Sequence, residues 1–169
     1  AVGVIEGGTV YRDQAMARNV QWLLEQYPGE KMVIWAHNGH VAEAENWMGG
    51  HLDEALGDDY FSVAFSFYEG EYRAVAEGGV GVNTAEPALE GSIDHVFDQV
   101  GPENFYLDLR GVQSTPAASW LAEERLFRSI GALAGPVSNT FAPIVLADDF
   151  DAVIFIRESS ASEQLDPVQ

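Results

Sequence analysis

The chain has 169 residues, of which 27 are Asp or Glu and 8 are Lys or Arg, so its formal net charge is −19. A surface this negative repels nucleic-acid phosphates and anionic lipids, which excludes nucleic acid and membrane surfaces as expected partners. No apolar run in the sequence is long enough to span a bilayer, and the lack of cysteine excludes disulfides and thiolate chemistry.

The basic residues are almost all arginines, with Lys31 as the single lysine. An acidic excess with so little lysine is typical of proteins adapted to molar salt, where dense screening removes the self-repulsion of the surface. The first residues have neither a basic segment nor a long apolar run, which argues against a signal peptide. We therefore expect a cytoplasmic protein from a halophilic organism, with an ordinary acidic mesophilic protein as the alternative.

The first elements along the chain are a helix and a buried strand. Apolar residues recur near the helical period from Tyr11 to Tyr27, Asp13 is a candidate N-cap, and Pro28 with Gly29 ends the helix. Residues 32–36 form a continuous apolar run of strand length, typical of a strand buried on both faces. A loop and a short helix over 47–57 follow.

The remainder of the chain alternates between strand and helix patterns. Strands are expected over 60–67, 104–109 and 152–157, with a possible hairpin across Gly70, a glycine-rich loop after it, a short helix capped by Ser92 and a helix opened by Pro116. This alternation predicts an α/β fold with a mostly parallel sheet and helices packed on both faces. We expect one domain over residues 1–158 and a flexible tail over 159–169.

Two of the four histidines, His37 and His40, directly follow the predicted 32–36 strand. In open α/β sheets the carboxyl ends of strands face a shared crevice, and imidazole acts as an acid or base near neutral pH. The pair is therefore a candidate catalytic site, with Asn38 orienting a ligand and Trp47 lining an apolar pocket. The alternative is a pair of capping or surface histidines that bind loop carbonyls.

Arg12 and Asp13 form a second candidate site before the first helix. An arginine there can hold a carboxylate or polarise a carbonyl through forked hydrogen bonds. The alternative is an N-cap aspartate next to an arginine in a surface ion pair, which contributes little.

A metal site is the third pattern considered, because Glu43 follows His37 and His40 at close spacing, and Glu45 or His51 could complete a set. The specific zinc motif H-E-x-x-H is absent. We expect no metal and no cofactor, and keep a metal-dependent hydrolase as an alternative.

Several segments, in order, resemble the erythromycin esterase family, which includes succinoglycan-biosynthesis-like proteins. They are YRDQAMARNVQW, WAHNGH, MGGHLDEALGDDYFSVAFSFYEG, FYLDLR and FDAVIFIRES. The resemblance implies a hydrolase that opens a macrolactone or another ester through histidine-activated water, without a covalent intermediate. His37 and His40 match the family's second histidine pair and Arg12 its substrate-binding arginine, with Asp13 and Glu43 expected to support them.

Members of this family are substantially longer, and their primary base histidine lies in the first half. The resemblance is therefore to the C-terminal half of the family fold. It implies two partners: a small-molecule ester or lactone substrate and an N-terminal half. A non-catalytic small-molecule-binding module is the alternative function.

Overall fold

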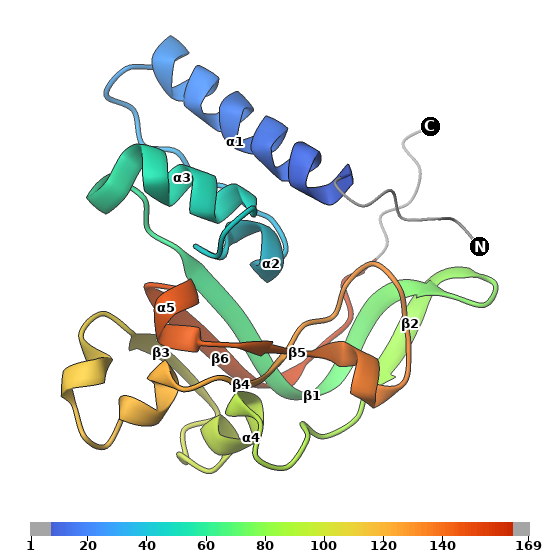
Figure 1. The fold of residues 1–169 in the computed structure, drawn as a ribbon. Coiled ribbons are helices and arrows are strands. Elements are labelled where there is room, and N and C mark those ends of the chain that lie inside the picture. Colours follow the sequence, from blue (N-terminus) through green and yellow to red (C-terminus); the bar gives the residue numbers. More distant parts are fainter. Residues whose placement is uncertain (1–7, 164–169) are drawn as a thin grey trace.

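The computed structural model describes residues 8–163, and their central sheet has four strands in the order β2-β1-β6-β3. Figure 1 shows how the helices lie around this sheet. The strands are β1 (Val63–Ala76), β2 (Gly79–Ala85), β3 (Asn104–Asp108) and β6 (Ala152–Ser159). Only β1 and β6 are parallel, whereas β1/β2 and β3/β6 are antiparallel. The α/β class is confirmed, but the prediction of a mostly parallel sheet is wrong.

β1 and β2 are antiparallel because a tight turn joins them, and this turn lies further along the chain than the hairpin predicted across Gly70. β1 runs through Gly70 without turning, and the chain reverses at Glu77 and Gly78 before β2. Two strands joined by a two-residue turn must be antiparallel. Part of the stretch expected as a glycine-rich loop therefore forms β2. Gly70 is required within the strand, because a Cβ there would lie 2.2 Å from the Ser159 carbonyl oxygen.

The helices are α1 (Gly8–Gln26), α2 (Asn38–Val41), α3 (Met48–Leu56), α4 (Ile93–Asp98) and α5 (Leu146–Asp149). α1 packs alongside α3, and α4 contacts β1 and a small hairpin of β4 (Arg125–Arg128) with β5 (Phe141–Ile144) (Figure 1). The Ser92 cap on α4 is confirmed, since its hydroxyl accepts from the His95 amide. The prediction of a helix after Pro116 is wrong, because 3₁₀ turns and β4 form there instead.

The two faces of the central sheet differ in burial. Ala64 and Phe155 lie on the face that packs against α4, and each is fully buried. On the opposite face, Phe65 and Tyr106 are 39% and 56% exposed. In the described part of the chain, the predicted helical cover is therefore missing from part of the second face.

The predicted strand at 32–36 is also wrong. Residues 31–36 are extended but belong to no strand, and Val33 and Trp35 are 92% and 83% exposed. A strand needs a neighbour to satisfy its backbone hydrogen bonds, and residues 8–163 place none beside this segment. Trp35, an expected core residue, lies at the surface for the same reason.

The last strand extends one residue into the predicted tail. Ser159, placed in the tail, completes β6, and its hydroxyl donates to the Glu71 carbonyl. The Ser162 carbonyl accepts a hydrogen bond from Arg73. Residues 164–169 of the predicted tail lie outside the described residues, and the single domain over 1–158 stays a prediction.

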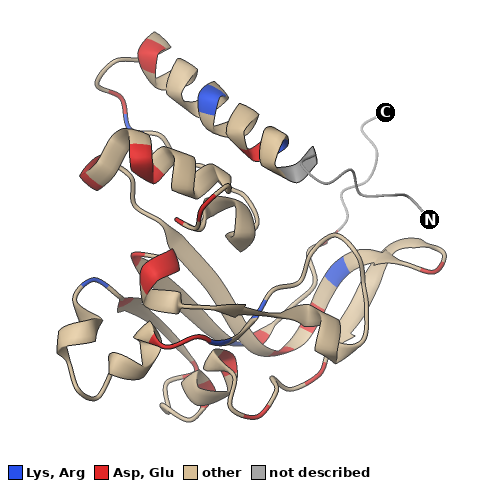
Figure 2. Cartoon of the chain, in the orientation of Figure 1, with Lys and Arg blue, Asp and Glu red and all other residues tan. Residues whose placement is uncertain are grey.

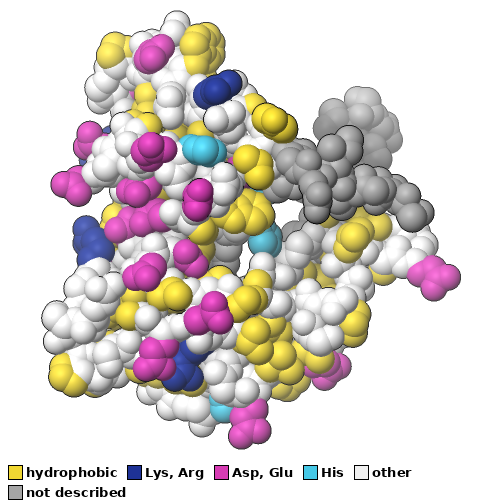
Figure 3. All heavy atoms as spheres, in the orientation of Figure 1, with side chains coloured by type: hydrophobic (Ala, Val, Ile, Leu, Met, Phe, Trp, Pro, Cys, Tyr) yellow, Lys and Arg dark blue, Asp and Glu magenta, His cyan; other side chains and the backbone are white. Residues whose placement is uncertain are grey.

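Acidic residues are scattered over most elements of the molecule, with few basic residues between them (Figure 2). Among the described helices, none has the length and apolar character needed to cross a membrane. The space-filling view shows carboxylates beside exposed hydrophobic side chains on the same face (Figure 3). The surface therefore combines strong self-repulsion with unburied apolar area.

Salt should stabilise this chain. Raising KCl from about 0.1 M to about 1 M shortens the screening length from ~10 Å to ~3 Å, which weakens repulsion among the 27 carboxylates. We expect the thermal midpoint, followed by circular dichroism, to rise over this range. KCl is the suitable salt, because sulfate also strengthens apolar burial. An unchanged midpoint would refute the halophilic interpretation.

Candidate active site

His37 ends the extended segment and serves as the N-cap of α2. Its Nδ1 accepts from the Gly39 amide at 3.1 Å, and its Nε2 donates to the Ile130 carbonyl at 2.9 Å. Because Nδ1 accepts, this network assigns the ring proton to Nε2. Both ring nitrogens are thus engaged by the backbone, so His37 here has the capping geometry considered as its alternative role.

His40 lies one turn later in α2 and has side-chain partners. Its Nδ1 is 2.7 Å from Asp13 Oδ1, and its Nε2 is 2.7 Å from Arg12 Nη2. A guanidinium only donates, so Nε2 must accept and Nδ1 must carry the proton that goes to Asp13. This tautomer leaves the basic nitrogen on the side of the exposed Arg12, with the imidazole itself 19% exposed.

Asp13 is a fully buried carboxylate within α1. Its Oδ1 also accepts from the Met48 amide at the start of α3, while its Oδ2 has no hydrogen-bond partner in the described part of the chain. The predicted N-cap role is wrong, because the helix begins at Gly8. Asp13 shares a helix face with the buried Ala17, a spacing that could have indicated its burial.

The predicted residues Arg12 and Trp47 also meet at His40. The Arg12 side chain is 59% exposed, and its Nε lies 3.9 Å from Asp13 Oδ2. The Trp47 ring packs edge-on against the imidazole, with 5.6 Å between ring centroids. The His37 ring is 6.4 Å away. The structure therefore gathers four of the predicted site residues around His40: Arg12, Asp13, His37 and Trp47.

Asn38, predicted to orient a ligand, is hydrogen-bonded to β1. Its Nδ2 donates to the Phe65 carbonyl at 2.6 Å, and its Oδ1 accepts from the Phe65 amide at 3.0 Å. The amide thus mimics a neighbouring strand and fixes α2 on the sheet. A ligand contact would require Asn38 to leave Phe65, and that role stays a prediction.

Glu43 lies in a separate polar cluster that the sequence did not reveal. The Ser62 hydroxyl donates to Glu43 at 2.6 Å and accepts from the Asp151 amide, while the Asp151 carboxylate accepts from the Ser62 amide. Burial raises the pKa of Glu43 to about 7, and the nearby charges of Asp151 and Asp53 act in the same direction. Glu43 therefore connects the start of β1 and the approach to β6, and no hydrogen bond between it and His40 is present in the described structure.

The neutral form of Glu43 should make the fold sensitive to pH. Its pKa rises from 4.5 to about 7 on folding, so the folded state binds more protons, and stability falls as pH increases through this window. Glu43→Gln should therefore match the wild type at pH 5 and exceed it at pH 8, by on the order of 1–2 kcal/mol after solvent screening. Urea unfolding at both pH values measures the difference.

Glu45→Gln is the matched control for this experiment, because Glu45 is an exposed neighbour in the same loop. It should change the unfolding free energy equally little at both pH values. A Glu43→Gln effect that is the same at pH 5 and pH 8 would contradict the assigned protonation.

The third predicted pattern was a metal site. Within residues 8–163, no three His, Asp or Glu side chains are grouped so that they could hold a metal ion. His37, His40 and Glu43 each have a different protein partner: Ile130, Asp13 and Ser62. The close spacing of His37, His40 and Glu43 in the sequence therefore does not bring their side chains together at one metal-binding point.

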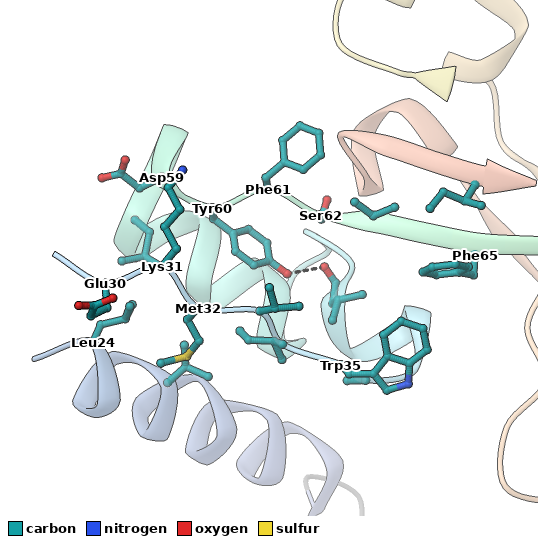
Figure 4. A pocket seen from close by; sticks show the side chains of 18 of the residues that line it. Leu24, Glu30, Lys31, Met32, Trp35, Asp59, Tyr60, Phe61, Ser62 and Phe65 are labelled. Carbon is teal, nitrogen blue, oxygen red and sulfur yellow. Dashed lines mark hydrogen bonds between the residues drawn. The ribbon is translucent and has the colours of Figure 1, made fainter. Parts of the chain in front are cut away.

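A groove of about 830 Å³ lies beside this site, between α1, residues 29–36 and the beginning of β1 (Figure 4). Leu24 and Met32 line it near α1, and Trp35 and Phe65 line its other end. The Tyr60 hydroxyl donates to the Val41 carbonyl at 2.7 Å within it. The two histidines do not line this groove, so the groove and the imidazole chemistry are separate features.

The fold and site together define a mixed α/β protein with a carboxylate-supported histidine on a short helix above the sheet. An erythromycin esterase family profile matches residues 5–159, so the chain belongs to the erythromycin esterase family. The resemblance seen in the sequence is thereby confirmed.

The relatives that the chain matches are considerably longer. It is 21% identical to a putative hydrolase, YbfO, of Bacillus subtilis (strain 168), covering 89% of this chain and 35% of that protein. It is 28% identical to an erythromycin esterase type II of Escherichia coli, covering 95% and 40%. A solved Bacillus cereus structure is 29% identical with a TM-score of 0.80, covering 90% and 39%. The chain thus spans less than half of each.

Proposed function

We propose that this chain carries part of the active site of a hydrolase that cleaves a small-molecule ester or lactone with water as the nucleophile. The observation that carries the proposal is the hydrogen-bonded series Asp13–His40–Arg12. Membership of the erythromycin esterase family, and relatives named hydrolase and esterase, support the reaction class.

In this proposal His40 takes or returns a proton through Nε2. Asp13 holds the tautomer in which Nδ1 carries the proton and stabilises the imidazolium that forms when Nε2 takes one. His37 reaches the reaction only if its Nε2 leaves the Ile130 carbonyl. It is thus the less available base of the two predicted catalytic histidines.

In this proposal Arg12 stabilises the negative charge that forms on the substrate. Attack of water on an ester carbonyl places negative charge on the carbonyl oxygen, and a guanidinium can donate two hydrogen bonds to it. Arg12 is exposed and now donates to His40 Nε2, so it must turn from the imidazole for the base to act. Trp47, packed on the same ring, is an apolar wall for the substrate. No cofactor is required for these steps.

Ester and lactone hydrolysis tests the proposal, with a panel that includes a macrolide and is assayed in molar KCl. In the enzyme completed by the N-terminal half, His40→Ala should abolish the turnover seen with the wild-type sequence, and His37→Ala should lower it less. Full activity of His40→Ala would contradict the proposed role. Saturable binding of a panel compound without turnover would instead favour the alternative, a non-catalytic small-molecule-binding module.

A further inference from the structure

Asn38 and Gly39 form the only Asn-Gly step in the sequence. An asparagine loses its amide when the next backbone nitrogen attacks the side-chain carbon, and a following glycine hinders this attack least because it has no Cβ. The other asparagines precede larger residues, such as Thr140 after Asn139. Asn38 is therefore the asparagine of this chain whose neighbour leaves the attack most open.

The hydrogen bonds around Gly39 provide a base for this reaction. Its amide donates to His37 Nδ1 at 3.1 Å, and Nδ1 has a free lone pair because the ring proton is on Nε2, which donates to Ile130. An imidazole can take a proton near neutral pH. His37 is the N-cap of the same short helix, so it stays beside the Gly39 nitrogen when this helix moves.

Strand β1 holds the Asn38 carboxamide in place. Its Nδ2 donates to the Phe65 carbonyl at 2.6 Å, and its Oδ1 accepts from the Phe65 amide at 3.0 Å. Attack requires the side-chain carbon to approach the Gly39 nitrogen, so both hydrogen bonds must first break. α2 has only four residues, and local opening of so short a helix makes the carboxamide available in a small fraction of molecules.

We propose that Asn38 is a self-modification site that β1 protects. When the hydrogen bonds to Phe65 open, the Gly39 nitrogen bonds to Asn38 Cγ and its proton passes to His37 Nδ1. The imidazolium returns this proton to Nδ2, which leaves as ammonia, and a cyclic succinimide remains. Water then opens the ring to aspartate or isoaspartate at position 38. This chemistry is separate from the proposed ester hydrolysis and does not depend on it.

The product cannot restore the contact with β1. A carboxylate only accepts hydrogen bonds, so it faces the Phe65 carbonyl oxygen without a proton to share. Isoaspartate also lengthens the backbone at the start of α2. Because His40 lies in this helix, its hydrogen bond to Asp13 is weakened as well. Modification of Asn38 therefore releases α2 irreversibly.

Peptide mapping by mass spectrometry tests the site in the 169-residue chain, incubated at pH 8 with and without urea. The acid product should accumulate at Asn38 and not at the exposed Asn139. In urea the rate at Asn38 should rise by roughly tenfold or more, because two hydrogen bonds no longer hold the carboxamide. In urea, Gly39→Ala should slow the reaction, because its Cβ hinders the attacking nitrogen. Equal rates with and without urea, or no product at Asn38, would overturn the proposal.

His37→Ser tests the base. Serine is a good N-cap whose oxygen still accepts from the helix amides, but it cannot take the proton at this pH. The variant should therefore modify Asn38 several-fold more slowly than the wild type in the folded chain. Hydrogen exchange of the Ala42 amide, which donates to the Asn38 carbonyl, corrects for any change in helix opening. A corrected rate equal to that of the wild type would overturn the assignment of His37.

Asn38→Asp tests the consequence, because it reproduces one of the two products. The amides of His40 and Ala42, both bonded within this turn, should exchange faster with solvent than in the wild type. Asn139→Asp adds the same charge at an exposed position and should leave their exchange unchanged. Unaltered exchange in Asn38→Asp would show that α2 stays on β1, and would overturn the proposed release.

Discussion

Asp13→Asn should lower the hydrolytic rate by roughly 10²–10⁴-fold while leaving KM nearly unchanged. The carboxylate accepts from His40 Nδ1, which places the lone pair on Nε2. An asparagine amide can donate instead, and the imidazole then carries its proton on Nε2 and cannot accept one there. The change is nearly isosteric, but Oδ1 accepts from both His40 Nδ1 and the Met48 amide, so an amide nitrogen at that position also leaves the Met48 amide without its acceptor.

The tautomer can be observed directly, without a substrate. The ¹⁵N chemical shifts of His40 should indicate a protonated Nδ1 in the wild type and a protonated Nε2 in Asp13→Asn. Gln14→Glu is a control for charge on the same helix, and it should alter neither the tautomer nor KM. An unchanged tautomer in Asp13→Asn would remove Asp13 from its positioning role.

Arg128→Met should destabilise the fold by about 3–5 kcal/mol, which corresponds to roughly 6–20 °C in thermal midpoint. Arg128 is 3% exposed, and its guanidinium donates to the carbonyls of Phe67, Tyr68 and Glu86. It also stacks 4.8 Å from the rings of Phe67 and Phe141. Methionine fills much of the volume but leaves three carbonyls without their donor.

Arg125→Met is the matched control on the same strand. Arg125 is half-buried and pairs at 2.9 Å with the exposed Glu123, and a pair open to solvent on one side contributes about 1 kcal/mol. The unfolding free energies of both variants, measured in urea, compare the loss of the buried Arg128 with the loss of Arg125. A loss below 1 kcal/mol for Arg128→Met would show that water or a neighbouring donor replaces the guanidinium.

Local patterns predicted much of the secondary structure. The helical period of α1, the glycine after α3, the Ser92 cap and the apolar runs of β1, β3 and β6 each report on a few adjacent residues, and each element is present. The sequence patterns failed where the conformation of a segment depends on whether another strand pairs with it. Glu77 and Gly78 make a turn only because β2 pairs back on β1, and residues 32–36 are apolar without a neighbouring strand.

The same division applies to the candidate site. The sequence by itself predicted Arg12, Asp13, His40 and Trp47 as site residues, because residue type and motif order are properties of the chain. Only the tertiary structure decided their contacts: packing of α1 against α3 places Asp13 on Nδ1 of His40 and Arg12 on Nε2. The tertiary structure also places Glu43 in hydrogen-bond contact with Ser62, and His37 with the Ile130 carbonyl. Hydrogen-bond partners far apart in sequence are fixed by packing, which no local spacing encodes.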